Sequence, residues 1–179
     1  MFVLLFNGFT ANKVADSLIQ KTCKESSEYP SAINNPQYYN LCIASLKENR
    51  ESQKVRNMDD LTVVGANNAI SNLTNVKNIV EKIVKERRYK SGLTKKLLED
   101  CLKLYNEGYQ SLTSALKYIK LKDFDKASTG FDNAKNGPIL CELEFNGDNQ
   151  QISPVKKEND LLFNMITIPY LINSIAHTS

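Results

Sequence analysis

Hydrophobic side chains recur at intervals of three and four residues along two long stretches of the chain. This spacing places them on one face of an α-helix, as the seam of a helical bundle requires. Ser91 and Gly92 separate the two stretches. The pattern predicts two long helices, the first carrying Thr62, Ala66, Ala69, Leu73, Val76, Val80 and Ile83 on its apolar face and the second Leu97, Cys101, Leu104, Gly108, Leu112, Ala115 and Ile119.

Two further helical patterns follow toward the C-terminus. Asp123 is a suitable N-cap for a third helix, and Pro138 is expected to kink or break that helix, because proline lacks a backbone donor and crowds the preceding turn. A polar loop over residues 146–150 precedes a fourth helix, which should bend near Pro169. Four amphipathic helices with short connections predict an antiparallel four-helix bundle over residues 57–179. The expected apolar faces are Phe124, Ala127, Phe131, Ala134, Cys141 and Phe145 in the third helix and Leu161, Met165, Ile168, Ile172 and Ile175 in the fourth.

Shorter helical patterns occupy residues 16–50. A first short helix is predicted over residues 14–23, with Val14, Leu18 and Thr22 on one side, and a second over residues 38–46. A polar loop with two prolines joins them. The chain is therefore predicted to be all-α, with a helical hairpin preceding the bundle.

The four cysteines, at positions 23, 42, 101 and 141, are widely spaced. A structural zinc site needs closely spaced ligand pairs, so two disulfides explain them better and imply an oxidising compartment. Four free thiols in a cytosolic helical protein are the alternative. Three pairings are open from the sequence. The sequential pairing would join neighbouring helices, which is what disulfide geometry demands.

The N-terminus carries an apolar run over residues 2–6, which is similar to the tail of a signal peptide. Residues 1–15 are interpreted as a truncated signal peptide remnant, with a buried N-terminal segment as the alternative, and residues 16–179 as a single domain. No later run is long enough to span a membrane. Asn72-Leu73-Thr74 is an N-glycosylation sequon, so Asn72 is a candidate glycosylation site.

Composition and charge favour a globular protein that does not bind nucleic acid. A length of 179 residues suits one domain, and 41% apolar and 24% charged residues are near globular averages. The net charge of +3 is small, and no basic stripe with interleaved aromatics is present. Five cations cluster before the second long helix, and we interpret them as the solvated end of a helix: Lys82, Lys85, Arg87, Arg88 and Lys90.

The residues needed for catalysis are missing from the sequence. The single histidine, His177, stands two residues from the C-terminus, where chains fray. No Gly-rich phosphate loop and no histidine-based metal motif occur. Glu99, Asp100 and Glu107 have neighbouring lysines at the spacing of surface ion pairs. The sequence predicts a protein that acts by binding, with no catalytic residue, metal or cofactor.

Several short motifs resemble the plant invertase and pectin methylesterase inhibitor family, most closely the invertase-inhibitor branch typified by the plane-tree pollen allergen. The resemblance runs from about Ser17 to the C-terminus. It implies a disulfide-pinned helical hairpin and a four-helix bundle, the disulfides Cys23–Cys42 and Cys101–Cys141, secretion, and steric blocking of a target enzyme's active-site cleft. The motifs are Thr22-Cys23-Lys24, Tyr39-Asn40-Leu41-Cys42, Ser45-Leu46, Leu97-Leu98-Glu99-Asp100-Cys101, Leu104-Tyr105, Cys141-Glu142 with Phe145, Ser153-Pro154-Val155 and Lys157-Glu158-Asn159.

One departure from the family bears on the target enzyme. Characterised invertase inhibitors carry Pro-Lys-Phe after an aspartate at the start of the third bundle helix, whereas Asp123 is followed here by Phe124-Asp125-Lys126. The resemblance without this motif favours inhibition of pectin methylesterase over acid invertase. The candidate enzyme-contact turn is Lys122, Asp123, Phe124, Asp125 and Lys126, in which the position of Phe124 on the apolar face favours a core role.

The resemblance also implies where the protein works and with what. We expect a monomer secreted to the apoplast and cell wall, or to the vacuole if the target is a vacuolar invertase, with the target enzyme as partner and no membrane or nucleic-acid partner. Two alternatives stay open: a bundle protein that has kept the fold and lost inhibition, and the pro-region of a larger pectin methylesterase.

Overall fold

The computed structural model describes residues 13–30, 32, 35–147 and 150–177. These residues form six α-helices and one short 3₁₀ helix, and no strand occurs among them, so the all-α prediction is confirmed. In chain order the elements are α1 (Lys13–Ser27), α2 (Tyr38–Glu48), the 3₁₀ helix η1 (Arg50–Lys54), α3 (Met58–Lys85), α4 (Gly92–Lys120), α5 (Phe124–Asn146) and α6 (Lys156–His177).

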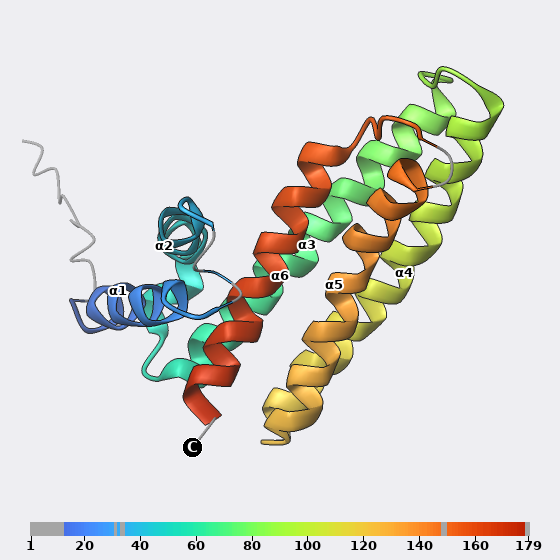
Figure 1. The fold of residues 1–179 in the computed structure, drawn as a ribbon. Helices are drawn as coiled ribbons and strands as arrows, with labels where there is room; N and C mark the ends of the chain where they lie inside the picture. The colour runs from blue at the N-terminus through green and yellow to red at the C-terminus, as the bar shows by residue number, and fades with distance from the viewer. Residues whose placement is uncertain (1–12, 31, 33–34, 148–149, 178–179) are drawn as a thin grey trace, which may run out of the picture.

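Helices α3 to α6 lie side by side as a bundle, and the hairpin of α1 and α2 packs at one end of it (Figure 1). Short connections reverse the chain between consecutive bundle helices, which are therefore antiparallel. The hairpin lies near the beginning of α3 and the end of α6. The predicted antiparallel four-helix bundle preceded by a helical hairpin is confirmed.

Two hydrophobic clusters hold these parts together. The larger cluster fills the bundle, and all seven residues of the apolar face predicted for α3 are buried. The smaller cluster joins the hairpin to the bundle. Burial of each large side chain contributes roughly 1.5–3 kcal/mol, so both clusters stabilise the fold substantially. The side chains that fix the hairpin include Ile19, Tyr38, Leu46, Leu61 and Ile172.

The predicted face of the first helix was only partly right, since Thr22 is buried. Val14 is 67% exposed and Leu18 is only partly buried, whereas Ala15 and Ile19 are fully buried. The reason is the rotation of α1 about its axis: Cys23 has to face α2 to form its disulfide. Residues four and eight positions before Cys23 share its face.

The apolar face of α6 is wider than predicted. Ile168 and Ile172 are buried as expected, but Leu161 is 41% exposed, and Leu162 and Ile166 are buried in its place. Helix α6 packs against α3 and α5 in the bundle and against α1 and α2 of the hairpin. A helix with neighbours on several sides buries more than one narrow stripe.

Of the kink or break expected at Pro138, the break does not occur: α5 continues through this residue, as α6 does through Pro169. Pro138 and Gly137 are both buried. A Cβ atom at Gly137 would lie 3.2 Å from the Leu104 carbonyl oxygen, so glycine lets α5 approach α4 closely here. Burial of the proline side chain partly offsets the backbone hydrogen bond that the residue cannot donate.

A second close contact of α4 and α5 provides a test of this packing. At Gly130 an added Cβ atom would lie 3.0 Å from the Ala115 Cβ and 3.1 Å from the Ser111 carbonyl oxygen. We expect Gly130→Val to lower the free energy of unfolding by about 2 kcal/mol, because the branched side chain forces the helices apart. Urea denaturation followed by circular dichroism measures the change.

Gly92 provides the matched control, since nothing lies within 4 Å of a Cβ atom added there. Gly92→Val should change the stability by less than about 1 kcal/mol, because the helix propensities of glycine and valine differ by only a few tenths of a kcal/mol. Equal effects at the two positions would show that helix propensity, and not the α4–α5 contact, determines the result.

Candidate functional site

Three residues, 121–123, connect α4 to α5. The candidate contact turn, residues 122–126, consists of the last two of them and the first residues of α5. Lys122 adopts a left-handed conformation with φ of 59°, which reverses the chain sharply. Asp123 caps α5 by accepting a hydrogen bond from the backbone N–H of Lys126 at 3.3 Å, as predicted for this residue. The Lys126 Nζ also donates to the Asp123 carboxylate at 2.6 Å, and this bond lowers the pKa of Asp123. The turn is therefore internally braced.

The turn is also tied to two other bundle helices. The Lys122 Nζ donates to one carboxylate oxygen of Asp59, at the start of α3, at 2.6 Å. The other oxygen lies 2.8 Å from the Nε2 of His177, the last residue of α6. The rings of His177 and Phe124 stack with centroids 3.4 Å apart and an angle of 8° between their planes. Residues from α3, the turn, α5 and α6 thus meet at one end of the bundle.

This cluster changes the role of two residues singled out from the sequence. The His177 ring contacts the Asp59 carboxylate and stacks on Phe124. Phe124 is half-buried and packs against the bundle core, in agreement with the core role favoured above. Partial burial by itself would raise the pKa of Asp59, but the hydrogen bonds from Lys122 and His177 outweigh it, so the pKa is lowered.

The exposed residues at and beside the turn are Leu121, Lys122, Asp125 and Lys126. The side chains of Lys122 and Lys126 are 66% and 62% exposed. Leu121, the residue after α4, is 62% exposed and was not singled out from the sequence. The sequence could have indicated its exposure, because Leu121 is an apolar residue between two lysines and lies off the apolar face of α4. Leu121, Lys122 and Lys126 form the candidate contact group of the turn.

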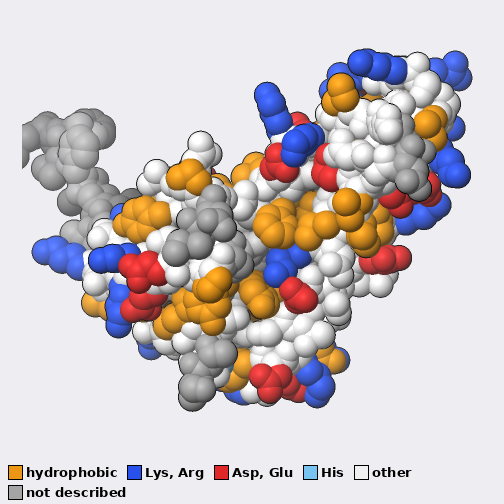
Figure 2. Space-filling model, viewed as in Figure 1, with side chains coloured by type: hydrophobic (Ala, Val, Ile, Leu, Met, Phe, Trp, Pro, Cys, Tyr) orange, Lys and Arg blue, Asp and Glu red, His pale blue; other side chains and the backbone are white. Residues whose placement is uncertain are grey.

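A groove between α5 and α6 is a second surface that the sequence did not reveal. Its volume is about 440 Å³, and apolar residues line much of it, including Pro138 and Phe163. Ile139 and Leu143 are 40% and 57% exposed. Figure 2 shows hydrophobic side chains gathered over the middle of the bundle face in view. Such a patch is typical of surfaces that contact another protein.

Both disulfides implied by the family resemblance are present. Cys23–Cys42 joins α1 to α2 with Cα atoms 5.7 Å apart, and Cys101–Cys141 joins α4 to α5 with Cα atoms 4.9 Å apart. No cysteine is free among the described residues. The first bridge fixes the hairpin and the second fixes the two bundle helices that carry the contact turn.

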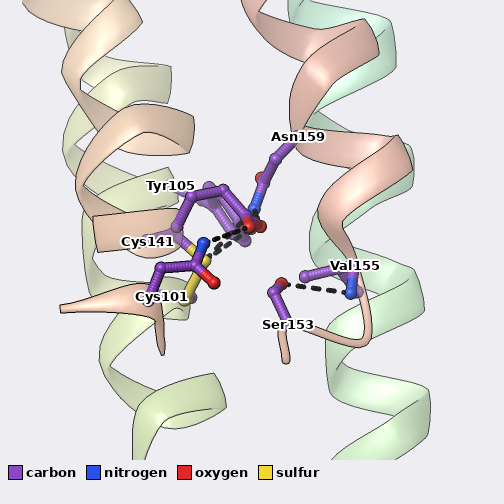
Figure 3. Close-up of a disulfide and its surroundings, with 8 residues drawn as sticks. Cys101, Tyr105, Cys141, Ser153, Val155 and Asn159 are labelled. Carbon is purple, nitrogen blue, oxygen red and sulfur yellow. Dashed lines mark hydrogen bonds between the residues drawn. A yellow bond between two sulfur atoms is a disulfide. The ribbon is translucent and has the colours of Figure 1, made fainter. Parts of the chain in front are cut away.

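A buried polar network surrounds the second disulfide (Figure 3). The Tyr105 hydroxyl donates to the Asn159 side-chain oxygen at 2.7 Å and lies 3.2 Å from the Cys141 sulfur. The Asn159 amide donates to a Glu142 carboxylate oxygen at 2.7 Å. Burial raises the pKa of Tyr105, so its hydroxyl remains a donor. The network ties α6 to the bridged pair α4 and α5, a role of Tyr105 and Asn159 that the sequence did not reveal.

The candidate glycosylation site lies in the middle of α3. The side chain of Asn72 lines a groove between α2 and α3, and its oxygen is buried without a hydrogen-bond partner in the described part of the chain. Leu73 is fully buried, and the Thr74 hydroxyl donates to the Ile70 carbonyl oxygen. Glycosylation of Asn72 stays a prediction.

The N-terminal prediction lies mostly outside the described residues, which begin at Lys13. Residues 13–15 of the predicted remnant already belong to α1, and Ala15 is fully buried. Within the described ranges, no helix is long and apolar enough to cross a membrane. The same residues contain no group of three or more His, Cys, Asp or Glu side chains that could hold a metal ion.

These features define a class of protein: a helical bundle with two disulfides, a short hydrogen-bonded turn at one end and an apolar groove between two of its helices. A model of the plant invertase/pectin methylesterase inhibitor family matches residues 17–172. The chain belongs to this family of enzyme inhibitors, and the resemblance seen in the sequence is confirmed.

Individual relatives agree with this assignment. Pectinesterase inhibitor 12 of Arabidopsis thaliana is 32% identical over 172 residues, covering 94% of this chain and 91% of its own length. A "putative invertase inhibitor" of Platanus acerifolia is 28% identical over 146 residues, covering 82% and 78%. A mutant form of a pectin methylesterase inhibitor from Arabidopsis has the same fold, with a TM-score of 0.69 at 13% identity, over 87% of this chain and 97% of that one.

Proposed function

We propose that this chain is a reversible protein inhibitor of a plant pectin methylesterase and is not itself an enzyme. The observation that carries the proposal is the 32% identity to an Arabidopsis pectinesterase inhibitor over 94% of the chain. The absence of Pro-Lys-Phe after Asp123 supports the same target over acid invertase.

Inhibition is steric in this proposal. The end of the bundle that carries the α4–α5 turn occupies the active-site cleft, and the bulky helices behind it keep the polysaccharide out. Leu121, Lys122 and Lys126 make the contact, since each of these side chains is more than 60% exposed. The stacked rings of Phe124 and His177 hold the turn against the end of α6.

The braced turn favours tight binding. A surface that is ordered before it meets its partner loses less conformational entropy on association. Here Asp59 fixes Lys122, and Asp123 fixes both the start of α5 and Lys126. The Cys101–Cys141 bridge holds the two helices on either side of the turn at a fixed separation.

The remaining parts of the proposal concern compartment and assembly. Two disulfides favour an oxidising compartment, and we place the protein in the apoplast and cell wall. It acts as a monomer, and its partner is the target enzyme.

Acid invertase is the second candidate target. The similarity to the Platanus protein named as a putative invertase inhibitor favours it, at 28% identity over 82% of this chain. In that case the vacuole is a further possible location, and the turn has to bind without the Pro-Lys-Phe motif.

A paired inhibition assay tests the proposal. Oxidised protein is titrated against a plant pectin methylesterase and a plant acid invertase at mildly acidic pH. We expect a dose-dependent loss of esterase activity and no change in invertase activity. Dilution of the inhibited mixture should restore the activity, because no covalent bond forms.

Each other outcome has a definite meaning. Loss of invertase activity alone would overturn the choice of target. No effect on either enzyme, with helical structure intact and both disulfides found by mass spectrometry, would leave the fold standing and contradict inhibition of these targets. A bundle protein that has kept the fold without inhibition would then be the better description.

A further inference from the structure

The end of the bundle opposite the contact turn carries a concentration of positive charge. Residues 81–96 contain seven Lys and Arg and two Glu, a net charge of +5, whereas the whole chain carries only +3. The remainder of the protein is therefore slightly acidic. Figure 2 shows Lys and Arg side chains gathered at the end of the bundle where α3 passes into α4. We call residues 81–96 the basic end.

Helix dipoles explain only part of this charge. Cations at the end of α3, such as Lys82 and Lys85, complement the negative end of its dipole. The same charges are unfavourable at the beginning of a helix, yet Lys95 and Lys96 stand in the first two turns of α4, and the first turn of α4 has no acidic residue. Fold stability therefore does not account for the whole cluster.

Three of the seven cations of the basic end form ion pairs within the protein: Lys82, Arg88 and Lys95. Glu86 pairs with Arg88 at 2.8 Å and with Lys82 at 4.0 Å, and Glu99 pairs with Lys95. Within the described residues no ion pair involves Lys85, Arg87 or Lys90, and all three side chains are exposed. Arg87 has a left-handed φ of 54°, which turns the chain at the end of α3.

The basic end is hollowed by a pocket of about 280 Å³ between the α3–α4 connection and the segment that leads into α6. Arg88 and Lys90 supply cations at its wall, and the half-buried Tyr89 supplies an aromatic ring. Thr94 and Gln150 add hydroxyl and amide groups. Cations for carboxylates, a ring for the apolar face of a sugar and polar groups for hydroxyls are the parts that recognise an acidic saccharide.

We propose that the basic end binds polygalacturonate, the de-esterified form of pectin. The choice of this polyanion rests on the proposed function, because a pectin methylesterase converts neutral methyl esters into carboxylates along the chain. The basic end and the contact turn lie at opposite ends of the bundle, so the protein can hold the product polymer at one end and the enzyme at the other. Binding concentrates the inhibitor where the esterase has already acted.

The test measures binding of the purified, oxidised protein to soluble oligogalacturonides by calorimetry, without calcium and without any esterase. We expect saturable binding that weakens as salt is raised, since exposed charges are screened. Fully methyl-esterified oligomers should bind about tenfold more weakly, because they have lost the charges that the cations contact. The triple variant Lys85→Gln, Arg87→Gln and Lys90→Gln should also lose about tenfold in affinity.

Two controls make the result decisive. The triple variant Lys13→Gln, Lys24→Gln and Lys117→Gln removes the same net charge from exposed positions elsewhere and should bind as the wild type does. Equal losses in both triple variants would overturn the assignment to the basic end. Equal affinity for poly-glutamate would overturn the choice of a saccharide, as would an absence of oligogalacturonide binding. Because no esterase is present, these outcomes are independent of the inhibition assay.

Discussion

Replacing both cysteines of the bundle disulfide, in the variant Cys101→Ala with Cys141→Ala, should lower the free energy of unfolding by about 4 kcal/mol. The bridge closes a loop of 40 residues, and the chain-entropy model assigns about this stabilisation to a loop of that length. Native contacts add to the loss, because the Cys141 sulfur is fully buried beside Tyr105 and Asn159. Urea denaturation followed by circular dichroism measures the change.

The hairpin disulfide provides the comparison. Cys23 and Cys42 are 19 residues apart, so the variant Cys23→Ala with Cys42→Ala should lose about 3 kcal/mol. Both variants should remain helical in the absence of urea. A smaller loss for the bundle pair than for the hairpin pair would contradict the loop-length argument and would assign the stabilisation to local packing instead.

The sequence was sufficient for the architecture because helical periodicity is a local property. The apolar face of α3 could be predicted residue by residue, since this helix buries one continuous stripe. The faces of α1 and α6 were partly wrong because tertiary contacts determine them. Cys23 sets the rotation of α1, and α6 has neighbours from both the bundle and the hairpin.

The contact turn illustrates the same limit at the candidate site. Asp123 could be predicted as an N-cap because capping depends on the next three residues. Asp59 and His177 are 118 residues apart, and no local pattern reports that they meet. The buried pair of Tyr105 and Asn159 was missed for the same reason, since its partners come from different helices. Polar contacts between residues far apart in the sequence can be identified only once the fold is known.

The contact turn itself leads to the largest expected effect on function. In the variant Lys122→Ala with Lys126→Ala, the inhibition constant should rise about thirtyfold, or about 2 kcal/mol, as for central contact residues of protein interfaces. The free energy of unfolding should change by less than about 1 kcal/mol, because both lysines are mostly exposed and form surface ion pairs. Inhibition is measured against whichever target enzyme the wild type inhibits.

Two matched variants separate contact from stability. Lys117→Ala with Lys120→Ala removes the same charge from exposed positions on α4 just before the turn and should inhibit as the wild type does. Phe124→Ala should lower the stability and leave inhibition intact, whereas the turn variant should do the reverse. The Phe124 variant loses the stack on His177 and part of the core, so stability should fall by about 2 kcal/mol while the folded protein still inhibits. If Phe124→Ala abolishes inhibition in the folded state, or if the turn variant inhibits normally, the contact surface has been placed wrongly. The α5–α6 groove then becomes the surface to mutate next, through Ile139 and Leu143.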